Sequence, residues 1–382
     1  MNRFKTASFG GFRRLYDLKL EMRPLIVLIG ANGVGKSSLL DVFALLAASA
    51  SGRLNAQLSE LGGITSCLTY DKSERMSLSL EMEVPDREPL CYELQLASKK
   101  QPYAIEHEVL SQKQRADEEP FKHIDSHFGE VLYSDVQDRK LIKPTWDHNL
   151  LETSLSQVPK MYRPPEDLRR TLSSATLYHV LDVGPRSPVK LPQQMRPAEL
   201  PGKDGEELVP LLHDLREKHP DRFEAVEDAL KVAFPDFERL NFPLVAAGMV
   251  AMTWKDRSFG TQLYMNQLSE GTLRFLWLTA LLQSPGLSTI TMIDEPEVSL
   301  HPELLSLLAK LLREASRRTQ IIVATHSDRL IRFLMPEEVL VMDIAEDGCA
   351  TAEWADTLDL DKWLAEYTLD EVWQMGRMGG RA

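Results

Sequence analysis

The N-terminal part of the chain carries two kinds of strand pattern. Apolar residues recur among polar ones over residues 14–20, and after Pro24 the run 25–29 is continuously apolar. The first pattern is typical of a half-exposed strand, and the second of a strand that is buried on both faces. Strict alternation over residues 76–84 and 92–96 predicts an antiparallel meander with one face in water.

The middle of the chain, residues 111–260, has a different pattern. Prolines break its first half into short pieces, and helical spacing of apolar residues follows at about 208–215 and 221–234, with a strand pattern near 249–254. Because neither sustained heptads nor an internal repeat is evident, we expect a compact insertion and not a long coiled coil.

From residue 267 onward, helix and strand patterns alternate. Apolar helices are predicted at 272–282 and 302–317, and buried strands at 289–293, 321–324 and 339–342. Pro302 stands where a first-turn proline is favoured. This alternation predicts an α/β fold.

Composition narrows the classes of function. The net charge of −13 over 382 residues argues against a general polyanion-binding protein, which needs clustered Lys and Arg. Cys67, Cys91 and Cys349 are widely spaced, which indicates a reducing compartment without a disulfide framework or a zinc-binding cysteine pair. No apolar run approaches the ~20 residues that span a bilayer, and the N-terminus lacks a signal-peptide pattern, so we expect a cytoplasmic protein without a membrane partner.

A glycine-rich segment lies between a predicted buried strand and a predicted helix. It fits the phosphate-loop pattern, in which backbone N–H groups surround phosphates at the positive end of a helix. Lys36 is expected to contact the β- and γ-phosphates, and Ser37 to bind Mg²⁺. The candidate nucleotide-binding residues in this segment are Gly30, Asn32, Gly33, Gly35, Lys36, Ser37 and Ser38.

Two later strands end in side chains that suit phosphate hydrolysis. Asp294 and Glu295 follow an apolar strand, where the first carboxylate can hold Mg²⁺ and the second can polarise the attacking water. His326 follows the next buried strand and is expected to sense the γ-phosphate. Alone, the two carboxylates would more often be acidic residues at an ordinary strand end, but the phosphate loop upstream favours the catalytic role. A lone histidine is more often a structural residue, but the position of His326 one strand beyond Asp294 and Glu295 favours the sensor role.

The segment Leu268-Ser269-Glu270-Gly271-Thr272 reads as a helix start between the other two motifs. Ser269 and the free N–H groups of that helix form an anion site. Since the phosphate loop already surrounds its own nucleotide, Ser269 and these N–H groups are expected to contact a nucleotide held by a second copy.

The order of these motifs resembles that of the ABC-type ATPases of the RecF/SMC-like branch, and most closely the bacterial AAA-type predicted ATPases related to OLD-type ATPases. The segments that carry the resemblance are Phe9-Gly10-Gly11-Phe12-Arg13, the phosphate loop, the signature at 268–272, Asp294-Glu295-Pro296, residues 297–302 and Thr325-His326-Ser327.

That resemblance implies a two-lobed P-loop NTPase head of the ABC type, with an antiparallel β subdomain and a mixed α/β insertion. It divides the chain at 1–110, 111–260 and 261–382. ATP and Mg²⁺ are the implied cofactors, with Lys36, Glu295 and His326 catalytic, Ser37 and Asp294 on the metal, and a homodimer that forms on ATP binding.

Further residue assignments follow from the resemblance. Gly271 reaches the nucleotide of the opposite protomer together with Ser269. Ser299 and His301 fall in the loop that links the two sites of a dimer, Arg13 is placed to touch the nucleotide, and Gln57 is a candidate for the Q-loop glutamine. Long-armed relatives insert a coiled coil that this sequence does not predict. Too few residues follow Asp343 for the nuclease domain of OLD-type relatives.

Two lesser candidates have ordinary explanations. His123 and His127 would share a face if their segment were helical, but no further zinc ligands cluster nearby in the sequence. Arg313, Arg317 and Arg318 could contact DNA phosphates, although arginines at a helix C-terminus also complement its dipole. We therefore favour a solvated, structural reading of both groups.

Three functions stay open. The first is an ATP-dependent switch in DNA repair or anti-phage defence, with DNA as a further partner. The second is a nucleotide sensor that recruits a separate effector such as a nuclease. The third is the energy subunit of a transporter, which the segment 297–302 and the long insertion disfavour.

Overall fold

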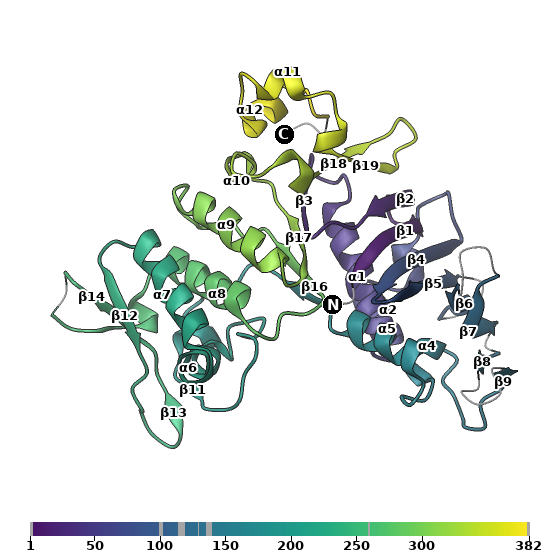
Figure 1. Ribbon diagram of the computed structural model, residues 1–382, viewed down its shortest axis with the longest axis horizontal. Helices are drawn as coiled ribbons and strands as arrows, with labels where there is room; N and C mark the ends of the chain where they lie inside the picture. Colours follow the sequence, from purple (N-terminus) through teal and green to yellow (C-terminus); the bar gives the residue numbers. More distant parts are fainter. Residues whose placement is uncertain are drawn as a thin grey trace.

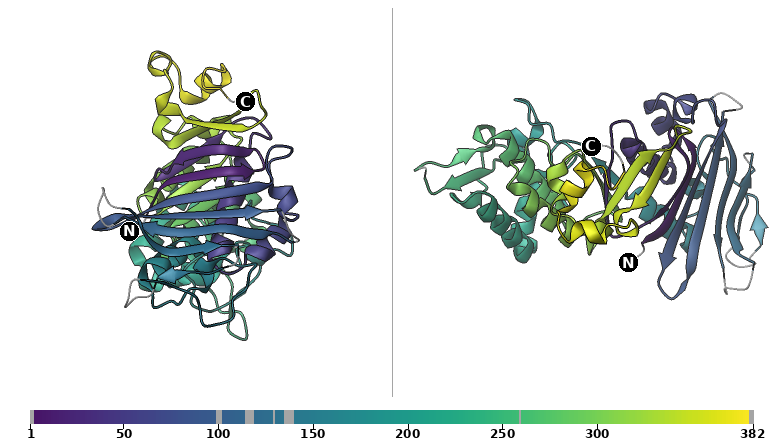
Figure 2. Two further views of the ribbon diagram at one scale, coloured as in Figure 1. Left: turned by 90° about the vertical axis from the view of Figure 1, so that its right-hand side faces the viewer. Right: turned by 90° about the horizontal axis from the view of Figure 1, so that it is seen from above.

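The computed structural model describes residues 3–98, 102–113, 119–128, 130–134, 140–258 and 260–379. These form an elongated molecule with an antiparallel sheet at one end, a central mixed sheet and a helical lobe at the other end (Figures 1 and 2). The predicted α/β class with an antiparallel β subdomain is confirmed. Among the described residues, no helix is both long and apolar enough to cross a bilayer.

Within the described residues, the antiparallel sheet has eight strands in the order β2-β1-β4-β5-β6-β7-β8-β9. Alternate residues of β4, from Met76 to Met82, are buried, as the meander pattern predicted. The buried face packs on α1 (Lys36–Ala50), and no described helix covers the other face, which Figure 2 turns toward the viewer. The strands are β1 (Phe4–Phe12), β2 (Leu15–Glu21), β4 (Arg75–Val84), β5 (Arg87–Ala97), β6 (Ala104–Gln112), β7 (Phe121–His127), β8 (Tyr133–Ser134) and β9 (Leu141–Ile142).

The central sheet carries the motif loops. Its order is β10-β16-β17-β3-β18-β19, with every neighbouring pair parallel except the last. Ile26 and Leu28 pack toward α1, whereas Val27 and Ile29 pack into the core of the helical lobe. Two cores explain why this strand is apolar throughout. The strands are β3 (Leu25–Ile29), β10 (Thr176–Tyr178), β16 (Ile290–Asp294), β17 (Gln320–Ala324), β18 (Val339–Ile344) and β19 (Ala350–Trp354).

The described part of the helical lobe contains four helices and two small antiparallel sheets. Its helices are α6 (Leu208–Lys218), α7 (Pro220–Ala233), α8 (Glu270–Gln283) and α9 (Leu304–Ser316). Its strands are β11 (Gln193–Gln194), β12 (Phe237–Asn241), β13 (Met249–Val250), β14 (Thr253–Asp256) and β15 (Leu263–Tyr264).

Shorter elements complete the chain. The remaining α-helices are α2 (Leu54–Glu60), α3 (Ile64–Cys67), α4 (Ser154–Gln157), α5 (Arg163–Ser173), α10 (Asp328–Ile331), α11 (Asp361–Leu364) and α12 (Leu369–Gln374). The 3₁₀ turns are η1 (Pro188–Lys190), η2 (Met265–Gln267), η3 (Pro336–Glu338) and η4 (Ala355–Thr357). Of these helices, α2, α4 and α5 pack on α1.

Several boundaries differ from the sequence pattern. The single strand expected at 249–254 is two strands, because β13 pairs with β11 and β14 pairs with β12 in different sheets. Pro302 lies just outside α9, whose N-cap residue is Glu303. The division proposed at residue 110 falls inside β6, and β7 to β9 continue the same sheet.

Candidate nucleotide-binding site

The phosphate loop connects β3 to α1. Gly30, Gly33 and Gly35 have φ angles of 144°, 78° and 116°, which side chains disfavour. A Cβ on Gly30 would also lie 2.3 Å from the carbonyl oxygen of Met342, so glycine is required there. Asn32 is exposed in the turn between Gly30 and Gly33.

An open cavity of about 270 Å³ lies over this loop. Of the predicted nucleotide-binding residues, five line it, together with the predicted sensor His326 and two arginines. Its lining is Arg13, Arg14, Gly33, Gly35, Lys36, Ser37, Ser38 and His326. The fold thus brings the residues after β3 together with the residue that follows β17.

Lys36 is buried below this cavity. Its Nζ donates hydrogen bonds to the carbonyl oxygens of Gly30 at 2.5 Å and Ala31 at 3.0 Å. Burial lowers the pKa of Lys36 from 10.5 to about 8, although the carboxylates of Glu295 and Asp294 raise it. The ammonium group is therefore held close to the loop by backbone oxygens and by two nearby negative charges.

The predicted carboxylates lie at the end of β16. Asp294 pairs with Ala324 of β17, and burial, followed by the charge of Glu295, raises the pKa of Asp294. Glu295 has a φ of 48° and donates its N–H to the Ala324 carbonyl at 2.8 Å. A glutamate whose backbone lies in the left-handed region is strained, and such strain concentrates at functional sites.

Glu295 also faces the histidine that follows β17. His326 Nε2 lies 3.8 Å from Glu295 Oε1. Burial and the neighbouring charge of Lys36 lower the pKa of His326, against the two carboxylates, which raise it. The neutral imidazole is therefore favoured in the nucleotide-free protein, and it is able to accept or donate a hydrogen bond at the cavity.

The signature segment lies at the start of α8. Ser269 is the exposed N-cap, and its Oγ accepts the Thr272 N–H at 3.1 Å. A Cβ on Gly271 would lie 2.6 Å from the Ser299 carbonyl oxygen, so glycine allows α8 to contact the segment after β16. The described residues that line the phosphate-loop cavity include neither Ser269 nor Gly271.

Ser299 fixes this contact from the other side. Its φ is 64°, and its Oγ accepts a hydrogen bond from Arg274 Nη1, one turn into α8. The signature helix and the predicted linking loop are therefore in direct contact within one chain. His301, in the same loop, is exposed, and its Nδ1 lies 3.7 Å from Glu303 Oε2.

Two neighbouring residues had no individual role predicted from the sequence. His179 directly follows β10, and its Nδ1 lies 3.6 Å from Asp294 Oδ2 because β10 pairs with β16. Glu297 is largely buried, and its Oε1 accepts from Thr325 Oγ1 at 2.6 Å and from the His326 N–H at 3.2 Å. Burial raises the pKa of Glu297, although these hydrogen bonds oppose the shift.

The sequence comparison identifies the family. Residues 25–332, most of the chain, match the family described as "AAA domain, putative AbiEii toxin, Type IV TA system". The chain belongs to this family of AAA domains. The predicted kinship with ABC- and SMC-like P-loop ATPases is thereby confirmed, and this AAA domain is a nucleotide-binding ATPase of that type.

Solved structures share the fold of this AAA domain at low sequence identity. An SMC head bound to the C-winged helix domain of ScpA is 12% identical, with a TM-score of 0.56 over 95% of this chain and 99% of that one. An SMC head with an extended coiled coil, bound to the C-terminal domain of ScpA derived from Pyrococcus furiosus, is 10% identical, with a TM-score of 0.55 over 96% and 98%. No curated protein matches the chain.

The remaining residues that the sequence singled out in the AAA domain lie either at the cavity or in structural contacts away from it. Arg13 lines the cavity and forms an ion pair with Asp41 at 2.5 Å. Gln57 lies on α2 and is not among the described cavity residues. Arg313 pairs with Glu338, and Arg318 donates to carbonyl oxygens at the end of α8, so the structural reading of these two arginines agrees with their contacts.

Proposed function

We propose that the protein hydrolyses Mg²⁺-bound ATP and that ATP closes two copies into a dimer in which each signature segment completes the partner's phosphate site. The observation that carries this proposal is the position of Ser269. It caps α8 at the surface, outside the cavity formed by the phosphate loop of its own chain. A helix N-terminus with an exposed hydroxyl fits phosphate oxygens, and a second copy supplies them.

Lys36 binds the β- and γ-phosphates in this proposal. Its ammonium exchanges the Gly30 and Ala31 carbonyl oxygens for phosphate oxygens, and a charge-assisted hydrogen bond to phosphate is stronger than one to a neutral carbonyl. The hydroxyl of Ser37 and the carboxylate of Asp294 are hard oxygen donors that suit Mg²⁺, and would hold the ion. When bound, the ion neutralises negative charge on the phosphates.

Glu295 is the general base. Its carboxylate accepts the proton of the attacking water, and His326 donates a hydrogen bond toward the γ-phosphate. Glu297 positions that histidine, because its carboxylate holds the Thr325 hydroxyl and the His326 backbone N–H. His179 stabilises Asp294 through the contact between Nδ1 and Oδ2, which links the end of β10 to the carboxylates.

The lowered pKa of Lys36 predicts that the affinity for nucleotide depends on pH. With a pKa of about 8, Lys36 takes up a proton on binding phosphate above that pH. Affinity is therefore full at neutral pH and falls as the pH rises through 8, by up to about tenfold per pH unit. Titration of a non-hydrolysable ATP analogue from pH 7 to about 9 measures this slope. Lys36→Arg stays charged and should remove it, so equal slopes would contradict the assignment.

Gly271→Ala should uncouple ATP binding from turnover. Its Cβ would lie 2.6 Å from the Ser299 carbonyl, so α8 or the linking loop must shift, while the phosphate loop is untouched. We expect a roughly tenfold or larger loss of kcat, the size that misplaced catalytic geometry produces, with nucleotide affinity kept. Gly260→Ala, where nothing lies within 4 Å, is the matched control. Full activity of Gly271→Ala would mean that this contact is dispensable.

The process served is proposed from the family. Its description as a putative toxin of a type IV toxin–antitoxin system favours a role in defence over one in DNA repair. A separate effector protein and DNA stay predictions of the sequence. The SMC heads that share the fold were solved with a bound ScpA domain, which supports a search for a partner that docks on this head.

The solution mass of Glu295→Gln with and without Mg-ATP tests the proposal. This variant binds ATP but should not hydrolyse it, so the mass should double when Mg-ATP is added. Adding Ser269→Arg to the same chain places a bulky cation on the signature surface and should keep the nucleotide-bound chain a monomer. A mass that does not change with Mg-ATP would overturn the ATP-dependent dimer.

A further inference from the structure

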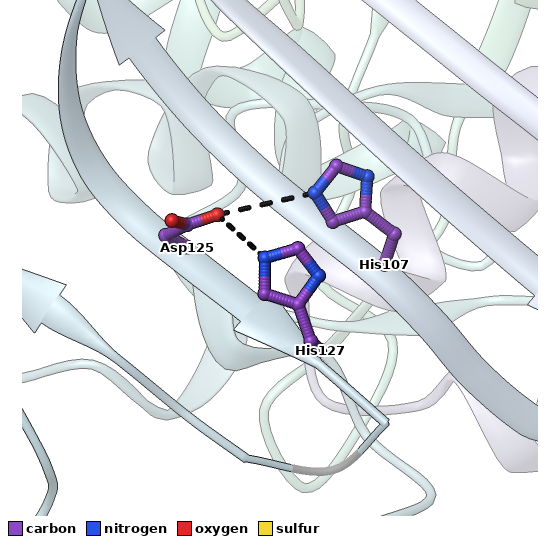
Figure 3. A group of neighbouring side chains, drawn as sticks. All are labelled: His107, Asp125 and His127. Atoms are coloured by element: carbon purple, nitrogen blue, oxygen red, sulfur yellow. Dashed lines mark hydrogen bonds and ion pairs between the residues drawn. The ribbon is translucent and has the colours of Figure 1, made fainter.

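We propose that the outer face of the antiparallel sheet holds a divalent transition-metal ion, of which Zn²⁺ is the reference case, between His107, Asp125 and His127. This inference is independent of the proposed ATP switch. The three side chains come from neighbouring strands, with His107 on β6 and the other two on β7 (Figure 3). One ligand atom from each lies within 4.8 Å of the others.

The strand register creates the cluster. His107 and His127 are direct cross-strand partners in the antiparallel β6–β7 pair, and Asp125 is two residues from His127 on the same face. Their rings are stacked, with centroids 4.4 Å apart and an interplanar angle of 16°. Residues on paired strands are held more precisely than residues on loops, so the two imidazoles and the carboxylate are pre-positioned.

The separations fit one small ion. His127 Nε2 lies 3.0 Å and His107 Nε2 3.9 Å from the same oxygen, Asp125 Oδ1. Zn²⁺ bonds to imidazole nitrogen and carboxylate oxygen at about 2.0–2.2 Å, which places tetrahedral ligand atoms about 3–3.5 Å apart. The two observed distances bracket that range, so small side-chain rotations close the site.

The carboxylate presents one oxygen to the histidines and the other to a lysine. Lys122 Nζ donates to Asp125 Oδ2 at 2.9 Å, which leaves Oδ1 directed at the two rings. Two imidazoles and one carboxylate are the donor set of sites that keep a further position for water. The side chains are 27%, 13% and 50% exposed for His107, Asp125 and His127, so an ion can reach them from solvent.

The surroundings of the cluster lower the pKa of His107 and that of Asp125. Burial and the adjacent His127 lower the pKa of His107, although Asp125 and Glu93 raise it. Burial raises the pKa of Asp125, but the hydrogen bond and charge of Lys122, together with His127, outweigh it and lower the pKa overall. A neutral imidazole and an ionised carboxylate are the forms that bind metals.

The structure corrects the sequence interpretation of this segment. Residues 121–127 form a strand and not a helix, and a register shift between Leu110 and Ser111 accompanies His123 turning inward. There, His123 Nδ1 lies 2.5 Å from the Tyr162 hydroxyl, on the buried side of the sheet. His127 faces outward, and its partner ligand from β6 is twenty residues earlier, which sequence spacing does not reveal.

An ion at this position joins β6 to β7 and stabilises the sheet. Titration calorimetry with Zn²⁺ on the full, nucleotide-free chain should show one ion per chain with micromolar or tighter affinity. His107→Ala, Asp125→Asn and His127→Ala should each weaken binding at least about tenfold. His219→Ala, an exposed histidine elsewhere, should leave it unchanged. Zn²⁺ should also raise the melting temperature of the wild type and not that of His127→Ala.

Three outcomes would overturn the site. The first is the absence of stoichiometric Zn²⁺ uptake in the micromolar range by the wild-type chain. The second is unchanged binding in all three cluster variants, which would place the ion elsewhere. The third is equal weakening in His219→Ala, which would indicate general surface binding. Metal-free melting curves of the variants show whether each one folds as the wild type does.

Discussion

Glu295→Gln should lose ATP turnover while it still binds ATP. Removing a general base typically slows a reaction by about 10²–10⁴-fold, and we expect kcat to fall within that range. The amide keeps the size of the side chain, so the left-handed backbone at Glu295 and its bond to Ala324 are unaffected. Steady-state phosphate release and direct nucleotide binding, measured on the same preparation, separate turnover from affinity.

An exposed glutamate outside the cavity provides the control for this variant. Glu314 lies on the exposed face of α9, and Glu314→Gln should hydrolyse ATP as the wild type does. Turnover of Glu295→Gln within a few-fold of wild type would show that another group activates the water. Asp294 would be the next carboxylate to test, because it adjoins Glu295 and its pKa is raised.

Lys36→Ala should lose nucleotide binding itself. In the structure, the buried ammonium donates two hydrogen bonds to backbone carbonyl oxygens, and with nucleotide bound we expect it to donate them to phosphate oxygens. Each hydrogen bond that involves a charged group contributes about 1.5–3 kcal/mol. Affinity for ATP should fall by at least about 100-fold, which corresponds to the low end of that sum. Calorimetric or fluorescence titration with an ATP analogue measures the change.

Two comparisons make the Lys36→Ala result interpretable. Lys160→Ala removes an exposed lysine outside the cavity and should bind nucleotide normally. A thermal melt of Lys36→Ala without nucleotide shows whether this variant folds as the wild type does. Unchanged affinity in a folded Lys36→Ala chain would remove this residue from the phosphate site.

Much of the ATPase head could be predicted from the sequence because its signals are local. The phosphate loop needs glycines at fixed spacing between a strand and a helix, and Gly30, Gly33 and Gly35 have the positive φ angles that such a loop requires. The run 25–29 is apolar because it separates two cores, so its burial was readable. Ser269 caps a helix through the next turn, which is also a local interaction.

The contacts that the sequence did not reveal are tertiary. The strand β10 has three residues, too few to give a periodic signal, so His179 beside Asp294 was missed. The need for glycine at 271 comes from the backbone of Ser299, 28 residues later. Glu297 was visible as part of a motif, but its link to Thr325 and His326 depends on the neighbouring strands β16 and β17.

The histidine cluster shows the same limit. His107 and His127 are brought together by antiparallel pairing of β6 and β7, and the register shift near His123 turns that residue to the buried face. Helical spacing of two histidines along one segment was the wrong geometry to consider. In a strand, successive side chains point to opposite faces of the sheet, so further ligands are expected on the neighbouring strand.

The most direct test of a shared ATP site is a mixture of two inactive variants. Lys36→Ala lacks a working phosphate loop and Ser269→Arg lacks a working signature, so each alone should be inactive. In a mixed dimer with composite sites, one site carries both changes and the other carries neither. Neither variant should pair with itself, so mixed dimers should form, and the working site in each should restore up to about half of wild-type ATPase activity, as expected for a symmetric dimer. A mixture that stays as inactive as its components would contradict the composite site.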